Sequence, residues 1–105
     1  MLESSKIEEI INKIAKEFNP EKIILFGSYA KGKPQEDSDL DLLIINDSNL
    51  PKHKRSFEIQ KALKGSKIPL DILVYTSSEF YSEINQKYSF LNSAIQSSKV
   101  VYERK

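Results

Sequence analysis

The chain has 105 residues, with 16 basic and 15 acidic side chains and a formal net charge of +1. This length suits one domain with a single modest core, and the balanced charge argues against a template-directed polymerase or direct nucleic-acid binding. The absence of cysteine excludes a disulfide framework and a thiolate metal site, and no run is apolar enough for a signal or membrane-spanning helix. We therefore expect one soluble, cytoplasmic domain over residues 1–105, without membrane association.

The first half of the chain predicts a helix followed by two strands. Residues 5–8 (SKIE) have the form of a capping box, and apolar residues then recur along one helix face until Asn19-Pro20 ends the helix. The apolar runs 23–26 and 42–45 have the β-branched and aromatic content of strands. Neither run alternates with polar residues, so we expect both strands in the interior of a sheet.

The second half predicts a helix over 52–64, a strand over 68–75 and two further helical segments. On that strand Asp71 shares one face with Leu73 and Tyr75. Residues 76–79 (TSSE) form a second capping box, helical spacing recurs over 91–95, and 100–102 suggests a final edge strand. This order of elements predicts an α/β layer structure in which helices cover a small sheet.

Three aspartates carry the strongest chemical signal. Asp39 and Asp41 stand two residues apart where the second strand begins, and the two-residue period of a strand directs both side chains to one face. Converging carboxylates favour a cation, and Mg²⁺ is the hard ion that combines carboxylate and phosphate ligands. Asp71, in mid-strand between apolar residues, adds a third carboxylate if its strand lies beside the second. The three acids then suit two ions about 3.5 to 4 Å apart, an arrangement used in nucleotidyl displacement.

Two other motifs, a calcium loop and a phosphate-binding loop, are excluded by residues of the same segment. A calcium loop over 37–48 needs glycine and glutamate where Leu42 and Ser48 stand. The segment 27–33 fits G-x-x-x-x-G-K, but Pro34 follows it and supplies no hydroxyl for a metal.

Other polar residues have simpler interpretations. Glu36 and Asp37 favour a solvated loop, and the lone His53 in a basic segment favours an exposed surface position over metal ligation. For Asp71 taken alone, capping or pairing with a lysine is an alternative to catalysis.

Gly27-Ser28 predicts a turn from a strand into a short helix. Gly27 would allow close backbone approach to a phosphate, and Ser28 would offer a hydroxyl and an amide at the helix start. Lys31 and Lys33 would add positive charge toward a triphosphate.

Together these segments (GSYAKG, SDLDLLI, LDILVY and FLNSAI…VVYE) resemble the DNA polymerase beta-like nucleotidyltransferase superfamily, specifically its minimal nucleotidyltransferases. The resemblance implies a mixed sheet with helices mainly on one face, and ATP as substrate with two Mg²⁺ ions. It implies Gly27, Ser28 and Lys31 at the phosphates, and Asp39, Asp41 and Asp71 as catalytic metal ligands. Lys31 replaces the usual arginine, so a bidentate phosphate contact is lost. Ser97-Ser98 replaces the usual Glu-Gly before the last strand.

The resemblance also implies a partner. Larger members carry an acceptor-presenting domain that this chain lacks, so the acceptor is expected in trans. Minimal nucleotidyltransferases commonly pair with all-helical HEPN toxins, which implies transfer of AMP from ATP to a toxin tyrosine by the antitoxin of a type VII toxin–antitoxin pair. Two alternatives remain open at this stage: a non-catalytic antitoxin that occludes its partner, and nucleotidyl transfer to a small hydroxyl compound.

Overall fold

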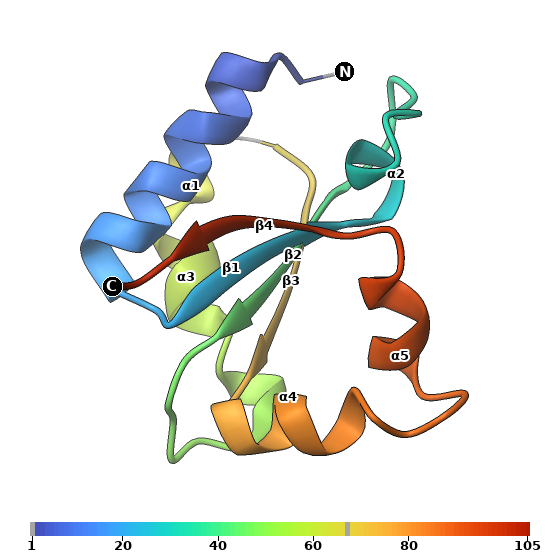
Figure 1. Cartoon of the computed structure of the whole chain (residues 1–105). Coiled ribbons are helices and arrows are strands. Elements are labelled where there is room, and N and C mark those ends of the chain that lie inside the picture. The colour runs from blue at the N-terminus through green and yellow to red at the C-terminus, as the bar shows by residue number, and fades with distance from the viewer. Residues whose placement is uncertain (1, 67) are drawn as a thin grey trace.

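The computed structural model describes residues 2–66 and 68–105, which form a four-stranded sheet with helices on both sides (Figure 1). The helices are α1 (Ser4–Phe18), α2 (Gly27–Ala30), α3 (Phe57–Ala62), α4 (Ser77–Glu83) and α5 (Phe90–Ile95), with short 3₁₀ helices η1 (Lys52–Lys54) and η2 (Lys64–Ser66). The strands are β1 (Lys22–Phe26), β2 (Leu40–Ile45), β3 (Leu70–Tyr75) and β4 (Lys99–Glu103).

The sheet is mixed, with strand order β3-β2-β1-β4. β1 pairs antiparallel with β2 and with β4, whereas β2 and β3 run parallel. The apolar runs of β1 and β2 therefore occupy the interior of the sheet and β4 lies at an edge, as the sequence predicts. The parallel pairing of β2 and β3 sets Asp41 directly opposite Asp71.

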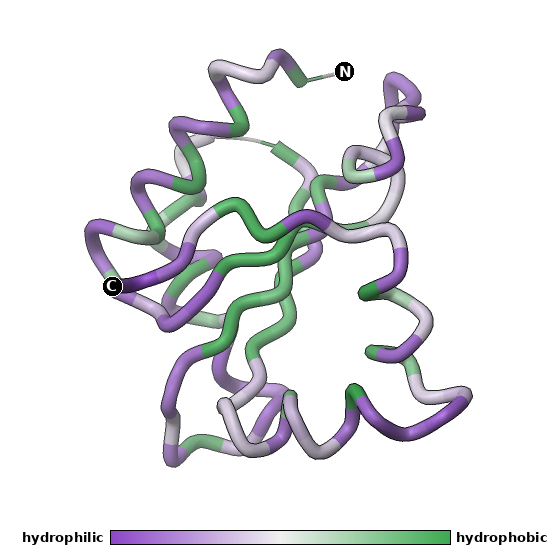
Figure 2. The backbone as a smooth tube through the Cα atoms, viewed as in Figure 1, coloured by the Kyte–Doolittle hydropathy of each residue, from purple (hydrophilic) through white to green (hydrophobic). Residues whose placement is uncertain are grey.

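Alternation along the strands divides the core between two faces. On one face α1 and α3 pack their apolar side chains, including Ile14 and Ile59, against Ile44 and Val74. On the other face α4 and α5 cover a smaller cluster around Ile45. Figure 2 shows the hydrophobic positions following the strands between these layers. The predicted mixed sheet is confirmed, and the longest helix and the larger cluster lie on one face, although α4 and α5 also cover part of the other.

The two predicted capping boxes have different outcomes. The box at 76–79 is confirmed: the Thr76 hydroxyl accepts from the Glu79 amide at 3.3 Å, and Glu79 Oε1 accepts from the Thr76 amide at 2.9 Å. The box at 5–8 is wrong, because α1 begins at Ser4 and its N-cap is Glu3, which makes no side-chain cap bond. The Glu3 carbonyl accepts from the amides of Lys6 and Ile7, so the backbone itself closes the first turn.

Two predicted boundaries also differ. The helix expected over 52–64 is broken into η1, α3 and η2, and the first break falls at Arg55, whose side chain donates to the Leu50 carbonyl at 2.8 Å. The third strand begins at Leu70 rather than at residue 68, because Pro69 has no amide hydrogen for the ladder; its carbonyl accepts from Leu40 at 2.9 Å. Among the described helices, none has the length and apolar character needed to span a bilayer.

Candidate active site

The three aspartates lie at one end of the sheet, where β2 and β3 begin. Because these strands are parallel, Asp41 and Asp71 meet in register, and Asp39 stands just before β2 starts at Leu40. Asp41 and Asp71 belong to the face covered by α4 and α5, since the residues two and four places further along each strand pack into that smaller cluster. The condition on which the third carboxylate depends, that the third strand lies beside the second, is therefore met.

The carboxylates form an uncompensated negative cluster. Asp41 is half-buried whereas Asp39 and Asp71 are exposed, and burial followed by the charges of Asp71 and Asp39 raises the pKa of Asp41. Among the described residues no lysine, arginine or histidine forms an ion pair with any of the three. The alternative of a lysine pair for Asp71 is thus not found in this part of the chain.

A preformed metal cage is not present in the described residues, since no three histidine, cysteine or acidic side chains there are grouped closely enough to hold an ion. The chemistry of the donor set nevertheless fits a hard cation. The ligands on offer are carboxylate oxygens, and a divalent ion would neutralise the charges of Asp71 and Asp39, which add to burial in raising the pKa of Asp41. Asp39, Asp41 and Asp71 remain the predicted metal ligands.

Gly27 positions the predicted phosphate-binding turn against Asp41. β1 ends at Phe26, opposite Asp41 in the register, and the chain turns at Gly27, with φ of 75°, into α2. A methyl group on Gly27 would overlap Oδ2 of Asp41 and lie 3.0 Å from its Cγ. The predicted turn from strand into short helix is confirmed, and the structure adds a steric reason for glycine that the sequence did not indicate.

A groove of about 330 Å³ lies beside this turn. One wall consists of Phe26, Gly27 and Lys31, and the other of Ser93, Gln96 and Ser97 at the α5 end. Its rim carries a lysine, hydroxyl groups and an amide but no carboxylate, which suits an anionic ligand. Phe90 on α5 is half exposed, and its ring meets that of Phe26 edge to face at 5.9 Å.

Sequence reasoning missed the α5 wall of this groove. Ser93 and Gln96 lie more than sixty positions from Gly27, and no local pattern distinguishes them from ordinary exposed polar residues of a helix. Of the two predicted lysines, Lys31 lines the groove and Lys33 does not. Glu36, Asp37 and His53 are exposed, as their simpler interpretations predict.

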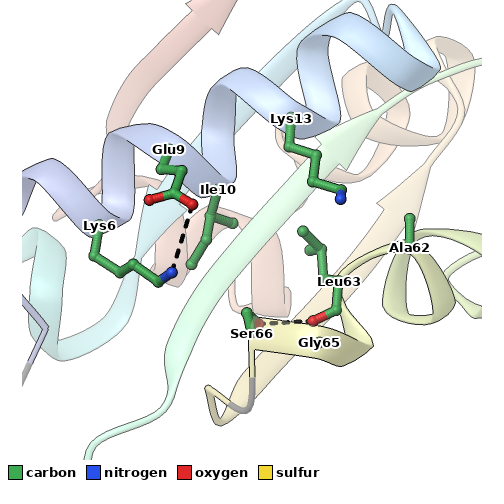
Figure 3. Close-up of a pocket in the computed structure, with 8 residues that line it drawn as sticks. All are labelled: Lys6, Glu9, Ile10, Lys13, Ala62, Leu63, Gly65 and Ser66. Atoms are coloured by element: carbon green, nitrogen blue, oxygen red, sulfur yellow. Dashed lines mark hydrogen bonds and ion pairs between the residues drawn. The ribbon is translucent and has the colours of Figure 1, made fainter.

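A second pocket lies between α1 and η2 (Figure 3), with a volume of about 250 Å³. Lys6 and Lys13 of α1 face Leu63 and Ser66 across it, and Lys6 is bound to Glu9 at 3.5 Å. Because α1 covers the opposite face of the sheet from the aspartates, this pocket contains none of the predicted site residues. The candidate active site is therefore the end of the sheet with the aspartates and the α2–α5 groove.

Curated proteins are similar to this chain in amino-acid sequence. It is 31% identical to the Methanocaldococcus jannaschii protein named "Putative protein adenylyltransferase MJ0604", over 97% of this chain and 100% of that protein. Another protein of that organism with the same description, MJ0141, is 35% identical over 66% of this chain and 75% of its own length.

Solved structures share the fold. A "putative nucleotidyltransferase from Sulfolobus solfataricus" superposes with a TM-score of 0.66 at 18% identity, covering 95% of this chain and 79% of that one. A toxin–antitoxin structure with AMP-PNP superposes with a TM-score of 0.57 at 21% identity, covering 93% of this chain and 74% of that one. A mutant of the toxin–antitoxin MntA–HpeT superposes with a TM-score of 0.58 at 18% identity, covering 99% of this chain and 76% of that one.

The family model described as "Polymerase beta, Nucleotidyltransferase" matches residues 8–105. The match includes the Gly27-Ser28 turn and all three aspartates, so it covers every predicted site residue. The chain therefore belongs to the polymerase beta nucleotidyltransferase family, as its sequence resemblance predicts.

Proposed function

We propose that this chain, as one minimal domain, transfers AMP from ATP to a protein hydroxyl. The acceptor in this proposal is a tyrosine of a HEPN-type toxin, and the chain acts as the antitoxin of that pair. The observation that carries the proposal is the in-register meeting of Asp41 and Asp71, with Asp39 near them, beside the Gly27 turn that also lines an anion-compatible groove. The adenylyltransferase relatives and the toxin–antitoxin structures support the choice of acceptor.

The nucleotide is assigned to the α2 side of the site. Gly27 and Ser28 offer backbone amides and a hydroxyl to the phosphates, and Lys31 adds a positive charge from the groove wall. Asp39, Asp41 and Asp71 would hold Mg²⁺, which when bound neutralises phosphate charge.

In the reaction, the acceptor hydroxyl oxygen forms a bond with the α-phosphorus of ATP. The bond between that phosphorus and the oxygen bridging to the β-phosphate breaks, and pyrophosphate leaves with the electron pair. Asp71 lies exposed at the edge of the site and is suited to take the hydroxyl proton. The product is a phosphodiester between AMP and the acceptor.

The test is to incubate the chain with α-labelled ATP, Mg²⁺ and the protein encoded by the neighbouring gene, and to follow the acceptor by mass. We expect AMP on the acceptor with the wild type, and a loss of about a hundredfold or more in rate with Asp39→Asn plus Asp41→Asn. Asp37→Asn is the matched control, because it removes an exposed carboxylate from the same loop.

Absence of transfer, or equal transfer by the Asp39→Asn, Asp41→Asn variant, would contradict the catalytic proposal. If cells are still protected from the toxin when all three aspartates are replaced by asparagine, inhibition is by occlusion. Transfer to a small hydroxyl compound without any protein partner would indicate a different acceptor class.

A further inference from the structure

Phe57 stands exposed between two shallow grooves on α3 and η1. Its side chain is 67% exposed, and Leu50 nearby is 50% exposed. The first groove, of about 360 Å³, runs past Leu50, His53, Lys54 and Glu58; the second, of about 400 Å³, runs past Gln60, Lys61 and Lys64. We call Phe57, Leu50 and these two grooves the α3 surface.

The exposure of Phe57 is not explained by the fold. α3 already packs onto the sheet through Ile59, and Leu63 at its C-cap joins the same core, so neither Phe57 nor Leu50 is needed there. Contiguous exposed apolar side chains with a polar rim mark interaction sites in soluble proteins. An aromatic anchor between two hollows is also the arrangement typical of the centre of a protein–protein interface.

The rim of the α3 surface is basic. Residues 51–64 contain five basic side chains and one acidic side chain, although the whole chain has a net charge of only +1. Arg55 is bound to Glu79, and the Lys52 ammonium lies 3.8 Å from the centroid of the Tyr75 ring. Within the described part of the chain, Lys54, Lys61 and Lys64 form no ion pairs. A partner that complements this rim presents carboxylates around apolar side chains.

The Leu50 and η1 end of the α3 surface and the catalytic carboxylates lie at opposite ends of β2. Asp41 stands near the start of that strand, whereas Leu50 and η1 follow its end at Ile45, roughly 13 Å further along at about 3.3 Å per residue. Figure 1 shows the same separation, with α2 at one end of the sheet and the β2–η1 connection at the other. Since α3 also packs on the face of the sheet opposite to α4 and α5, a protein bound to the α3 surface leaves the α2–α5 groove open.

We propose that the α3 surface docks the acceptor protein, through a face with apolar anchors surrounded by carboxylates. The acceptor then spans two contacts, with its anchor at Phe57 and its modified hydroxyl at the aspartates. The identity of the occupant rests on the proposed function, whereas the chemistry of the face that binds here rests on the α3 surface alone.

The experiment compares two exposed pairs of an aromatic residue and a lysine. The test variant is Phe57→Ser with Lys61→Glu. The control is Tyr88→Ser with Lys87→Glu on the α4–α5 connection, where Tyr88 is 89% exposed and the Lys87 ammonium lies 5.6 Å from its ring centroid. Each full chain is titrated, without nucleotide, against the fluorescently labelled protein encoded by the neighbouring gene, at two salt concentrations.

We expect the test variant to weaken Kd by about tenfold or more, with a smaller salt dependence, and the control to stay within about twofold of the wild type. Equal binding by the test variant, or no binding by the wild type, overturns the docking proposal.

The two proposals fail separately. Binding that depends on Phe57 but is followed by no AMP transfer refutes the proposed function and leaves the α3 surface as a docking site. If AMP is transferred and the test variant binds the acceptor normally, the docking proposal is refuted and the proposed function stands. The docking proposal is also overturned if the paired change leaves acceptor binding intact and abolishes binding of a single-stranded RNA oligonucleotide, or self-association of the chain in sedimentation.

Discussion

Gly27 and Asp41 constrain each other at the turn from β1 into α2. The Cα of Gly27 occupies the space beside the Asp41 carboxylate, and any side chain there would displace that carboxylate. Gly32 provides a natural comparison, because it has a similar φ of 72° but a methyl group added to it would meet no atom within 4 Å. The two glycines therefore separate the cost of a left-handed backbone from the cost of a steric clash.

We predict that Gly32→Ala loses about 1 kcal/mol of stability from backbone strain, that Gly27→Ala loses more because of the clash with Asp41, and that only Gly27→Ala also lowers kcat, by about tenfold or more. The reason is that Gly27→Ala moves an acid that must hold its position during catalysis. The measurements are urea unfolding and the steady-state kinetics of AMP transfer. A rise in KM for ATP with unchanged kcat would instead mean that Gly27 serves phosphate approach alone.

Between elements, Arg55 joins the β2–α3 connection to α4. Its side chain is only 8% exposed; it donates to the carbonyls of Leu50 at 2.8 Å and Val74 at 3.3 Å, and binds both carboxylate oxygens of Glu79. The hydrogen bond from Arg55, followed by that from the Thr76 backbone, lowers the pKa of Glu79 to about 2. Glu79 thus both caps α4 and anchors the segment that carries the α3 surface.

The depressed pKa of Glu79 predicts a pH-dependent contribution to stability. Because the folded pKa of about 2 lies below the ordinary value of 4.5, the contribution is fully present above pH 4.5 and is lost as the pH falls toward 2. Glu79 is 37% exposed, so we discount the shift and expect Glu79→Gln to destabilise the protein by about 1 to 2 kcal/mol at pH 7.

Urea unfolding between pH 7 and pH 2.5 measures this contribution, and the difference between wild type and Glu79→Gln should shrink at the acid end. Glu58→Gln is the control, since Glu58 is exposed and forms no ion pair in the described residues. A constant difference across this range would show that the loss comes from packing and not from the charge of Glu79.

At the scale of the whole molecule, the site is assembled from the start of β2, the start of β3, the α2 turn and the end of α5. Parallel pairing joins the first two, and β1 delivers the α2 turn opposite Asp41. The chain that leads from β3 through α4 then returns α5 to the same end of the sheet, where it closes the groove across from Lys31.

We predict that Ser93→Ala with Gln96→Ala raises KM for ATP by about two- to tenfold and leaves kcat close to the wild-type value, because these groups line the groove proposed for the nucleotide and lie away from the aspartates. Ser82→Ala with Gln86→Ala is the matched control, since both residues are exposed and neither lines the groove. An equal KM for the two variants in steady-state assays would exclude α5 from nucleotide binding.

Local features of this chain were predictable because they depend on residues close in sequence. The apolar runs of β1 and β2, the capping box at Thr76, and the breaker at Pro20 follow from periodicity and from hydrogen bonding within a few positions. Even among these local features, the predicted capping box at Ser5 was wrong, since the backbone alone can close the first turn of a helix.

By itself the sequence determined the strand interiors, which its composition and spacing record directly, and its motifs resembled those of the family to which the chain belongs. Only the tertiary structure decided that Asp41 lies opposite Asp71, that Gly27 makes room for Asp41, and that α5 forms the second wall of the groove. It also decided that Arg55 is a buried anchor while Phe57 is exposed. These facts depend on contacts between distant segments, where strand register and helix packing settle which of several chemically similar residues meet.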